Sequence, residues 1–319
     1  VISQAEYEKY KDEPFTYVEK IKKENKNPQA QNQPSLKVTY NFPYFVDYVI
    51  NELEARYGIN QEAIFSGGLK IYTTVDSKIQ KAAESVYADP KNFPKDIDGK
   101  HVESAMVIMN PKDGSIRAMV GGRNYDTARA LNRAWQAKRQ PGSSIKPLVA
   151  YTPAFEKGGY FTGTVLDDMP VKYKGGDGKD WTPSDFDTEG GGWRGLITMR
   201  YALTHSVNIY AIKLLEKIGV DWGWQFAKQK FGLPLTDRDK VLSLALGTPE
   251  VTVLDMVSAY SAFPTGGIKA QRHAIAKVVD AKGAVIVDNT NIEKTRIMSE
   301  QTAYIMTDML RNVVTGGTG

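Results

Sequence analysis

A serine and a lysine lie one helical turn apart where the sequence predicts the start of a helix. The stretch Arg139-Gln-Pro-Gly-Ser-Ser-Ile-Lys-Pro147 leads into a run whose apolar residues recur at helical spacing, and Gly158 predicts its end. Because positions i and i+3 share one face of a helix, Ser143 and Lys146 can touch. Pro147 is tolerated in a first turn, but we expect it to bias Lys146 away from helical backbone angles.

This pair offers the chemistry that a nucleophilic serine needs. A serine hydroxyl attacks when a nearby base takes its proton, and a lysine amine is such a base once burial or neighbouring cations lower its pKa. The positive end of the helix dipole would favour an oxyanion at the same place. The plainer alternative is that Ser143 caps a helix and Lys146 is solvated, since a Ser-x-x-Lys arises about once by chance in a chain of this length.

A second polar group, Thr204-His-Ser-Val-Asn208, interrupts two apolar runs. Ser206 and Asn208 are two residues apart, so in a turn both can face one cleft. A hydroxyl there can pass a proton between Lys146 and a leaving group, and an amide can hold a substrate carbonyl. The alternative is a simple helix cap, which serine and asparagine supply equally well.

Composition excludes several other kinds of site. The absence of cysteine excludes disulfides, zinc-thiolate sites and thiol catalysis, and the three histidines show no paired ligand spacing, so neither a metal nor a cofactor is expected. The net charge of +4, from 41 basic and 37 acidic residues, is too mild and too scattered to indicate nucleic acid binding. No stretch approaches the roughly 18 consecutive apolar residues of a membrane span.

The remaining pattern predicts a mixed chain. A helix ending at Gly58, a strand over 69–75 and a helix capped by Asp76 form a small α/β module before residue 100. From Glu103, two apolar strands flank the turn at 111–114 and predict a hairpin that opens a new sheet. Beyond residue 143 the pattern predicts helices over 196–204, 209–218, 222–231, 252–263 and 300–313, and a second hairpin over 274–279 and 284–287.

Together these stretches resemble the class A, high-molecular-mass penicillin-binding proteins. Ser-x-x-Lys and Ser-x-Asn each occur once, in the order of the signature that penicillin-binding proteins share with serine β-lactamases. The wider match comprises 103–122, Asn132-Arg-Ala134, 139–147 and Leu244-Ala-Leu-Gly-Thr-Pro-Glu-Val-Thr252. Residues 67–76 resemble the linker module of those proteins and 1–14 the tail of their glycosyltransferase domain, so the resemblance spans essentially the whole chain.

The resemblance implies an α+β fold, with a central antiparallel sheet covered by helices on both sides, an all-helical lobe, and a small α/β linker module before them. It implies a glycosyltransferase tail at 1–18, a linker module at 19–102 and a transpeptidase domain at 103–319. It also implies a location at the extracytoplasmic face of a bacterial membrane, with a membrane tether upstream of Val1.

By the same likeness, the partners are peptidoglycan stem peptides ending in D-Ala-D-Ala, and β-lactam antibiotics. Ser143 would be acylated, Lys146 would accept its proton, Ser206 would relay the proton to the departing D-alanine, and Asn208 would orient the substrate and the lysine. One alternative is a non-catalytic β-lactam sensor or scaffold. A serine β-lactamase shares the first two motifs, but the linker module and the glycosyltransferase tail are foreign to it.

Two departures from the family pattern matter. The sequence contains no Lys-Thr-Gly or Lys-Ser-Gly, although the family strand with this motif supplies a wall of the groove and an oxyanion-hole N–H, an interaction worth roughly 3 kcal/mol in comparable sites. We expect this C-terminal remainder of the domain as a second polypeptide or outside this chain. The second departure is Trp181-Thr-Pro-Ser-Asp-Phe186, where the family usually shows an asparagine near Asp185, so contacts there stay open.

Overall fold

Helices and short antiparallel strands alternate along the chain. The computed structural model describes residues 41–99, 101–127, 129–175, 178–186 and 192–319. The predicted glycosyltransferase tail at 1–18 and the first part of the predicted linker module lie outside these residues. In the described part of the chain, every helix is too short or too polar to span a bilayer.

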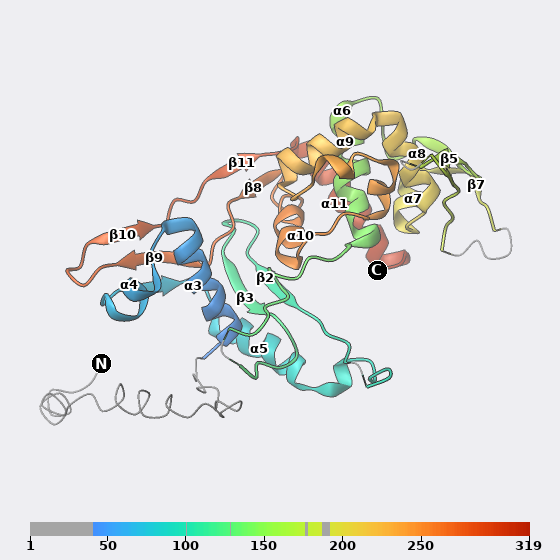
Figure 1. The fold of residues 1–319 in the computed structure, drawn as a ribbon. Helices are drawn as coiled ribbons and strands as arrows, with labels where there is room; N and C mark the ends of the chain where they lie inside the picture. The colour runs from blue at the N-terminus through green and yellow to red at the C-terminus, as the bar shows by residue number, and fades with distance from the viewer. Residues whose placement is uncertain (1–40, 100, 128, 176–177, 187–191) are drawn as a thin grey trace, which may run out of the picture. The chain divides into compact units, whose positions relative to one another are not determined.

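Figure 1 shows the elements in chain order. The α-helices are α3 (Pro43–Tyr57), α4 (Gln61–Ser66), α5 (Ser77–Ala88), α6 (Thr152–Lys157), α7 (Met199–Thr204), α8 (Asn208–Ile218), α9 (Val220–Phe226), α10 (Val253–Tyr260) and α11 (Glu300–Gly316). Tighter or wider helical turns are η1 (Pro90–Asn92), η2 (Gly142–Ile145), η3 (Pro147–Tyr151), η4 (Ala227–Phe231), η5 (Asp237–Asp239) and η6 (Leu242–Leu246). The strands are β1 (Lys70–Thr73), β2 (Met106–Met109), β3 (Ile116–Val120), β4 (Val165–Asp168), β5 (Tyr173–Lys174), β6 (Asp180–Trp181), β7 (Gly195–Thr198), β8 (Ile268–Ala270), β9 (Ile275–Val279), β10 (Val285–Asp288) and β11 (Lys294–Arg296).

One sheet joins strands that are far apart in the sequence. β1 pairs antiparallel with β9, and β9 pairs antiparallel with β10. The predicted strand at 69–75 and the predicted hairpin at 274–287 are confirmed, and the structure adds the long-range pairing between them. The sheet therefore contains residues from both sides of the boundary predicted at residue 103.

A second sheet is the predicted hairpin after Glu103, confirmed as β2 and β3. α5 packs on β3 and is capped by Asp76 as predicted, since this carboxylate accepts two backbone N–H groups of its first turn. Gln80 of α5 is buried and exchanges hydrogen bonds of 2.8 and 2.9 Å with the backbone of Met119. α3 also covers β3 and ends at Gly58, as predicted, in the left-handed conformation.

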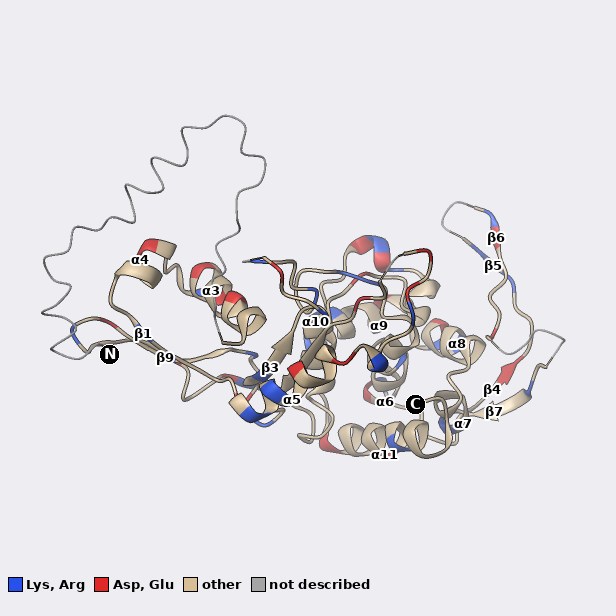
Figure 2. Ribbon diagram, turned by 90° about the horizontal axis from the view of Figure 1, so that it is seen from below, with Lys and Arg blue, Asp and Glu red and all other residues tan. Residues whose placement is uncertain are grey.

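The largest core lies among the helices. α8 is apolar on most of its circumference, which is the pattern of a helix buried on all sides. Its side chains without exposed surface are Ile209, Tyr210, Ala211, Ile212, Leu214, Leu215 and Ile218. η3, α6, α9, η6 and β4 surround it. Figure 2 accordingly shows α8 mostly in the colour of uncharged residues.

The predicted helix from Ser143 to Lys157 is three helical forms in succession, the 3-10 turn η2, the π turn η3 and α6. Lys146 has helical angles (φ −49°, ψ −47°), so the predicted effect of Pro147 on it was wrong. The Ser143 carbonyl accepts the N–H of Lys146, and therefore does not need the N–H that a proline lacks. The chain then widens, and the Thr152 N–H reaches the Pro147 carbonyl.

Two other predicted helices differ at their ends. The residues at 196–198 belong to β7, which pairs with β4, and α7 begins only after Thr198, whose hydroxyl accepts the N–H of Tyr201. The predicted helix over 222–231 is α9 followed by the π turn η4. The residues of β7 have helical apolar spacing, but their pairing with β4 makes them a strand. The periodicity of a sequence contains no information on such long-range pairing.

Candidate active site

The predicted lysine lies inside the protein. Lys146 is 1% exposed, and its side chain ends at the connection between α7 and α8. Its Nζ lies 2.6 Å from the Ser206 carbonyl oxygen, 3.2 Å from Ser206 Oγ and 2.7 Å from Asn208 Oδ1. The structure therefore brings together three of the four predicted site residues, and the alternative of a solvated lysine is excluded.

The environment of Lys146 makes its neutral form more accessible than that of a solvated lysine. Burial lowers the pKa of Lys146 to about 8, and the nearby Asp185 carboxylate acts in the opposite direction. The cause is the loss of hydration around the ammonium group. A neutral amine has two hydrogens, which match the two closest acceptors, the Ser206 carbonyl and the Asn208 amide oxygen. Its lone pair is then available to accept a proton.

Ser206 has a strained backbone conformation, and both its carbonyl and its hydroxyl face the Lys146 amine. Ser206 has φ 53°, a left-handed conformation that is uncommon for residues other than glycine and often occurs at functional sites. The Ser206 N–H donates to Leu203 O at 3.1 Å, and the Val207 N–H donates to Ala202 O at 2.9 Å, which ends α7 and turns the chain into α8. This turn directs both the carbonyl and the hydroxyl of Ser206 toward Lys146.

A carboxylate whose role the sequence left open holds Asn208. Asp185 Oδ1 accepts the backbone N–H of Asn208 and, at 3.2 Å, that of Ile209, so it caps α8. The Asn208 side-chain NH₂ donates to the Ser184 carbonyl at 2.9 Å, which leaves the amide oxygen directed at Lys146. The 184–185 segment thereby fixes the orientation of the amide that contacts the lysine.

Asp185 has an acidic neighbour. Asp168 has no exposed surface, and its carboxylate accepts the backbone N–H of Arg194 at 3.3 Å and pairs with the guanidinium at 3.0 Å. The same guanidinium lies 3.7 Å from Asp185. Burial, followed by the hydrogen bond with Asp168, raises the pKa of Asp185 to about 6. Two buried carboxyl groups in contact favour sharing one proton, so we expect the charge beside Asn208 to change near this pH.

Ser143 lies in an exposed turn that residues from later in the chain hold in place. Gly142 (φ 58°) faces Gly247 (φ 80°), where a Cβ atom would lie 2.2 Å from the Gly142 carbonyl oxygen, so this approach requires glycine. On another side, the Tyr260 hydroxyl donates to the Ser144 carbonyl at 2.6 Å. η6 and α10 thus support η2 at two points.

The contact predicted between Ser143 and Lys146 is not formed. Within the described ranges, no hydrogen bond links Ser143 Oγ to any partner, and the Lys146 amine donates to Ser206 and Asn208. The spacing of three residues in a 3-10 turn still places both side chains on one face.

Sequence reasoning missed Asp168, Arg194 and the capping role of Asp185. Asp185 precedes the helix that it caps by 23 residues, so no cap pattern near Asn208 signals it. The one available signal was the departure from the family pattern near Asp185. Asp168 and Arg194 meet because β4 ends beside the start of β7, a pairing that the sequence did not predict.

The chain is similar to proteins of one family. A family model described as the penicillin binding protein transpeptidase domain matches residues 104–319. Penicillin-binding protein 2a of Streptococcus pneumoniae is 35% identical over 284 residues, which are 88% of this chain and 38% of that protein. Penicillin-binding protein 1F of Bacillus subtilis is 35% identical over 279 residues, 87% of this chain and 37% of that protein. The chain thus spans less than two fifths of the length of these relatives.

A solved structure gives the same result for the fold. The PonA1 protein from Mycobacterium tuberculosis in complex with penicillin V has a TM-score of 0.69 at 26% identity, over 84% of this chain and 70% of that one. The predicted α+β fold class is therefore confirmed. The residues matched by the family model include every predicted site residue, namely Ser143, Lys146, Ser206 and Asn208.

Proposed function

Because this chain belongs to the penicillin-binding protein transpeptidase family, we propose that it contains a serine D,D-transpeptidase site with Ser143 as the nucleophile. The observation that carries the proposal is the burial of Lys146 against Ser206 and Asn208, an environment that turns an ammonium into a base. The substrate is the D-Ala-D-Ala end of a peptidoglycan stem peptide, and the product is a cross-link between two strands.

The first half-reaction makes an ester on the serine. Ser143 Oγ attacks the carbonyl carbon between the two terminal D-alanines while its proton passes to the neutral Lys146 amine. The tetrahedral intermediate then collapses, and its carbon–nitrogen bond breaks. Ser206 Oγ, 3.2 Å from Lys146 Nζ, gives its proton to the departing D-alanine nitrogen and takes one from the lysine. The step ends with an acyl ester, free D-alanine and a neutral lysine.

The second half-reaction transfers the acyl group. An amine of a neighbouring peptide attacks the ester carbonyl, its proton passes to the lysine by the same route, and the proton returns to Ser143 as the ester bond breaks. An amide bond replaces the amide that was lost, so no energy source is needed beyond the original peptide bond. Asn208 keeps the Lys146 amine in place throughout, through its side-chain oxygen at 2.7 Å.

β-Lactams would react at the same serine. The PonA1 structure in complex with penicillin V supports this reading for a relative. Opening of the lactam ring leaves no departing fragment, so the acyl-enzyme persists. The parent protein would act at the extracytoplasmic face of the membrane, held by a tether upstream of this chain, as its likeness to full-length relatives implies.

The alternative is a sensor or scaffold that is acylated by β-lactams without turning over peptide. Penicillin labelling does not separate these two functions, whereas release of D-alanine from a stem pentapeptide does. A transpeptidase releases D-alanine in proportion to time and forms a dimeric peptide when an acceptor amine is supplied. A sensor releases none after one equivalent. We favour the transpeptidase because the family model that matches residues 104–319 is that of a transpeptidase domain.

Peptide mapping by mass spectrometry after penicillin treatment tests the nucleophile. The expected result is one adduct, on the peptide that contains Ser143, and its loss in Ser143→Ala. Ser144→Ala is the matched control, because this neighbour is also an exposed hydroxyl in η2 and should keep the adduct. An adduct on any other residue would overturn the assignment of Ser143.

A further inference from the structure

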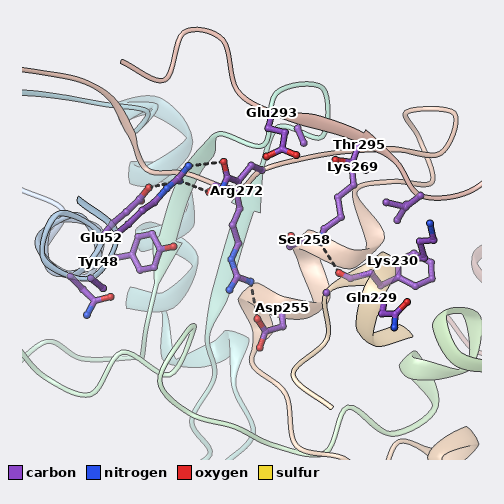
Figure 3. A pocket seen from close by; sticks show the side chains of 18 residues that line it. Tyr48, Glu52, Gln229, Lys230, Asp255, Ser258, Lys269, Arg272, Glu293 and Thr295 are labelled. Atoms are coloured by element: carbon purple, nitrogen blue, oxygen red, sulfur yellow. Dashed lines mark hydrogen bonds and ion pairs between the residues drawn. The ribbon is translucent and has the colours of Figure 1, made fainter. Parts of the chain in front are cut away.

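A polar cavity of about 540 Å³ lies apart from the proposed active site. Side chains from α3, η4, α10, β8 and the segments that flank β8 and β11 line it, and none of the four proposed site residues is among them. Figure 3 shows Tyr48 and Glu52 on one side, Lys230 on the other and Arg272 between them. We call it the Lys269 cavity. Its volume is that of a site for a small organic molecule.

The two buried or half-buried carboxylates of the cavity have structural tasks. Glu52 accepts the backbone N–H of Ala274 at 2.7 Å and pairs with Arg56 at 3.3 Å. Asp255 accepts from Thr252 at the start of α10 and pairs with Arg272 at 2.8 Å. The third acidic lining residue, Glu293, is exposed at the rim. The acceptor oxygens that face inward are thus engaged by the protein itself.

The cations of the cavity keep unused donors. Lys269 is half-buried, and its ammonium donates to the Phe231 carbonyl at 2.7 Å, which leaves two of its three hydrogens without an acceptor within the described ranges. Burial and then the positive charge of Arg272 lower the pKa of Lys269, while Asp255 opposes them. Gly232 makes room for this amine, because a Cβ there would lie 2.8 Å from Lys269 Nζ.

Two side-chain hydroxyls that line the cavity, those of Ser258 and Tyr48, also have no hydrogen-bond acceptor in the described residues. Ser258, on the face of α10 toward the cavity, is 4% exposed, and Tyr48 on α3 is 8% exposed. In the part of the chain that the structure describes, neither hydroxyl makes a hydrogen bond. Neither hydroxyl oxygen is among the fully buried atoms without a partner, so both reach the open space of the cavity and can donate to a molecule bound there. These two hydroxyls add to the donors that Lys269 offers to the cavity.

We propose that the Lys269 cavity is a ligand site for a small organic anion, bound through carboxylate or phosphate oxygens by Lys269, Arg272 and the Ser258 hydroxyl. An oxyanion accepts hydrogen bonds from both cations and from the hydroxyl, which satisfies each of the unused donors. It also adds a negative charge beside Lys269, which makes no ion pair in the described residues, whereas Arg272 is already paired with Asp255. Carboxylates and phosphates share this chemistry, and the experiment has one arm for each.

Thermal unfolding of the 319-residue protein in citrate, in glycerol phosphate and in sodium chloride of equal ionic strength tests the site. The expected result is a saturable rise in Tm with one of the two organic anions and none with chloride, since a ligand that binds only the folded state stabilises it. Lys269→Met should abolish the rise. Lys228→Met is the matched control, because this lysine of η4, a segment that also lines the cavity, lies over the Trp224 ring and is not itself a lining residue.

A second, milder variant guards against misfolding of Lys269→Met. Ser258→Ala removes only a hydroxyl and should weaken binding by about tenfold, the effect of one hydrogen bond to a charged group. A rise with citrate alone identifies a carboxylate ligand, and a rise with glycerol phosphate alone a phosphate ligand. A Tm that follows ionic strength alone, or a rise that persists in both Lys269→Met and Ser258→Ala, would overturn the proposal.

Discussion

The carboxylate of Asp185 accepts the backbone N–H of Asn208, 23 residues further along the chain, and so holds the side chain that contacts Lys146. Asp185 also acts on the lysine through its charge, which raises the lysine pKa against the effect of burial. One carboxylate therefore controls both the position of the amide and the basicity of the amine, and these two effects can be separated by mutation.

Asp185→Asn should move the pH dependence of acylation without unfolding the site. The asparagine oxygen can still accept the N–H of Asn208, but the negative charge is gone, so the pKa of Lys146 should fall below about 8. The alkaline rise of the acylation rate then shifts to lower pH. Rates of fluorescent penicillin labelling between pH 5.5 and about 9, set to bracket the cited pKa values, measure this shift.

Two further variants complete that test. Asp185→Ala should lose the cap of α8 as well, at a cost of about 1 kcal/mol in the free energy of unfolding. Asp180→Asn removes an exposed carboxylate that pairs with Lys172 and Lys174, and should leave the pH profile unchanged. Equal profiles for wild type and Asp185→Asn would show that this charge does not reach the amine.

Lys146→Arg should remove the base while keeping a cation at the site. Arginine stays protonated at all accessible pH values, so it cannot take a proton from Ser143. We expect acylation to fall by about 10² to 10⁴ at pH 8, the usual contribution of a general base. Wild-type acylation should rise with pH through about 8, because only the deprotonated amine is active. A Lys146→Arg variant that keeps this rise would contradict the role of the lysine.

Gly247→Ala should disturb the turn that carries Ser143. The added methyl would lie 2.2 Å from the Gly142 carbonyl oxygen, in a residue at φ 80°. Gly283→Ala is the matched control, since Gly283 has φ 88° in the β9–β10 hairpin with nothing within 4 Å of its Cβ position. In both variants, alanine in the left-handed conformation should lower the free energy of unfolding by about 1 kcal/mol. Gly247→Ala should lower it by roughly a further 1 to 3 kcal/mol, the range for overpacking.

Urea unfolding gives the two stabilities, and penicillin labelling gives the two rates. Gly283→Ala should label at the wild-type rate because the added methyl meets nothing within 4 Å and its hairpin is remote from η2 in the sequence. If Gly247→Ala labels as fast as Gly283→Ala, the contact between Gly142 and Gly247 has no part in placing Ser143.

Replacing Ser206 separates its backbone from its hydroxyl. Ser206→Gly and Ser206→Ala both lose the proposed proton relay but keep the carbonyl that Lys146 contacts. Glycine adopts φ 53° without strain, so Ser206→Gly should be more stable than Ser206→Ala by about 1 kcal/mol. Both should slow D-alanine release. A normal rate of release in either variant would exclude the hydroxyl as the relay.

The sequence predicted those features that short spacing determines. Asp76 and Gly58 act at the ends of their own helices, and both hairpins follow from alternation around a local turn. The grouping of Lys146 with Ser206 and Asn208 rested on the chemistry of these residues and on the family resemblance, because local spacing cannot relate residues that are 60 and 62 positions apart. Asp168 and Arg194 were missed since the pairing of β4 with β7 brings them together, and side-chain patterns carry no information on such partners.

The pairing of β1 with β9 has a practical consequence for anyone who wishes to shorten this protein. The family match begins at residue 104, but a piece cut there would lose β1, and β9 would become the outer strand of its sheet with a row of unsatisfied amides and carbonyls. Such an edge recruits other chains. Truncation at the family boundary should therefore yield aggregates, whereas a cut just before α3 keeps the strand that shields it.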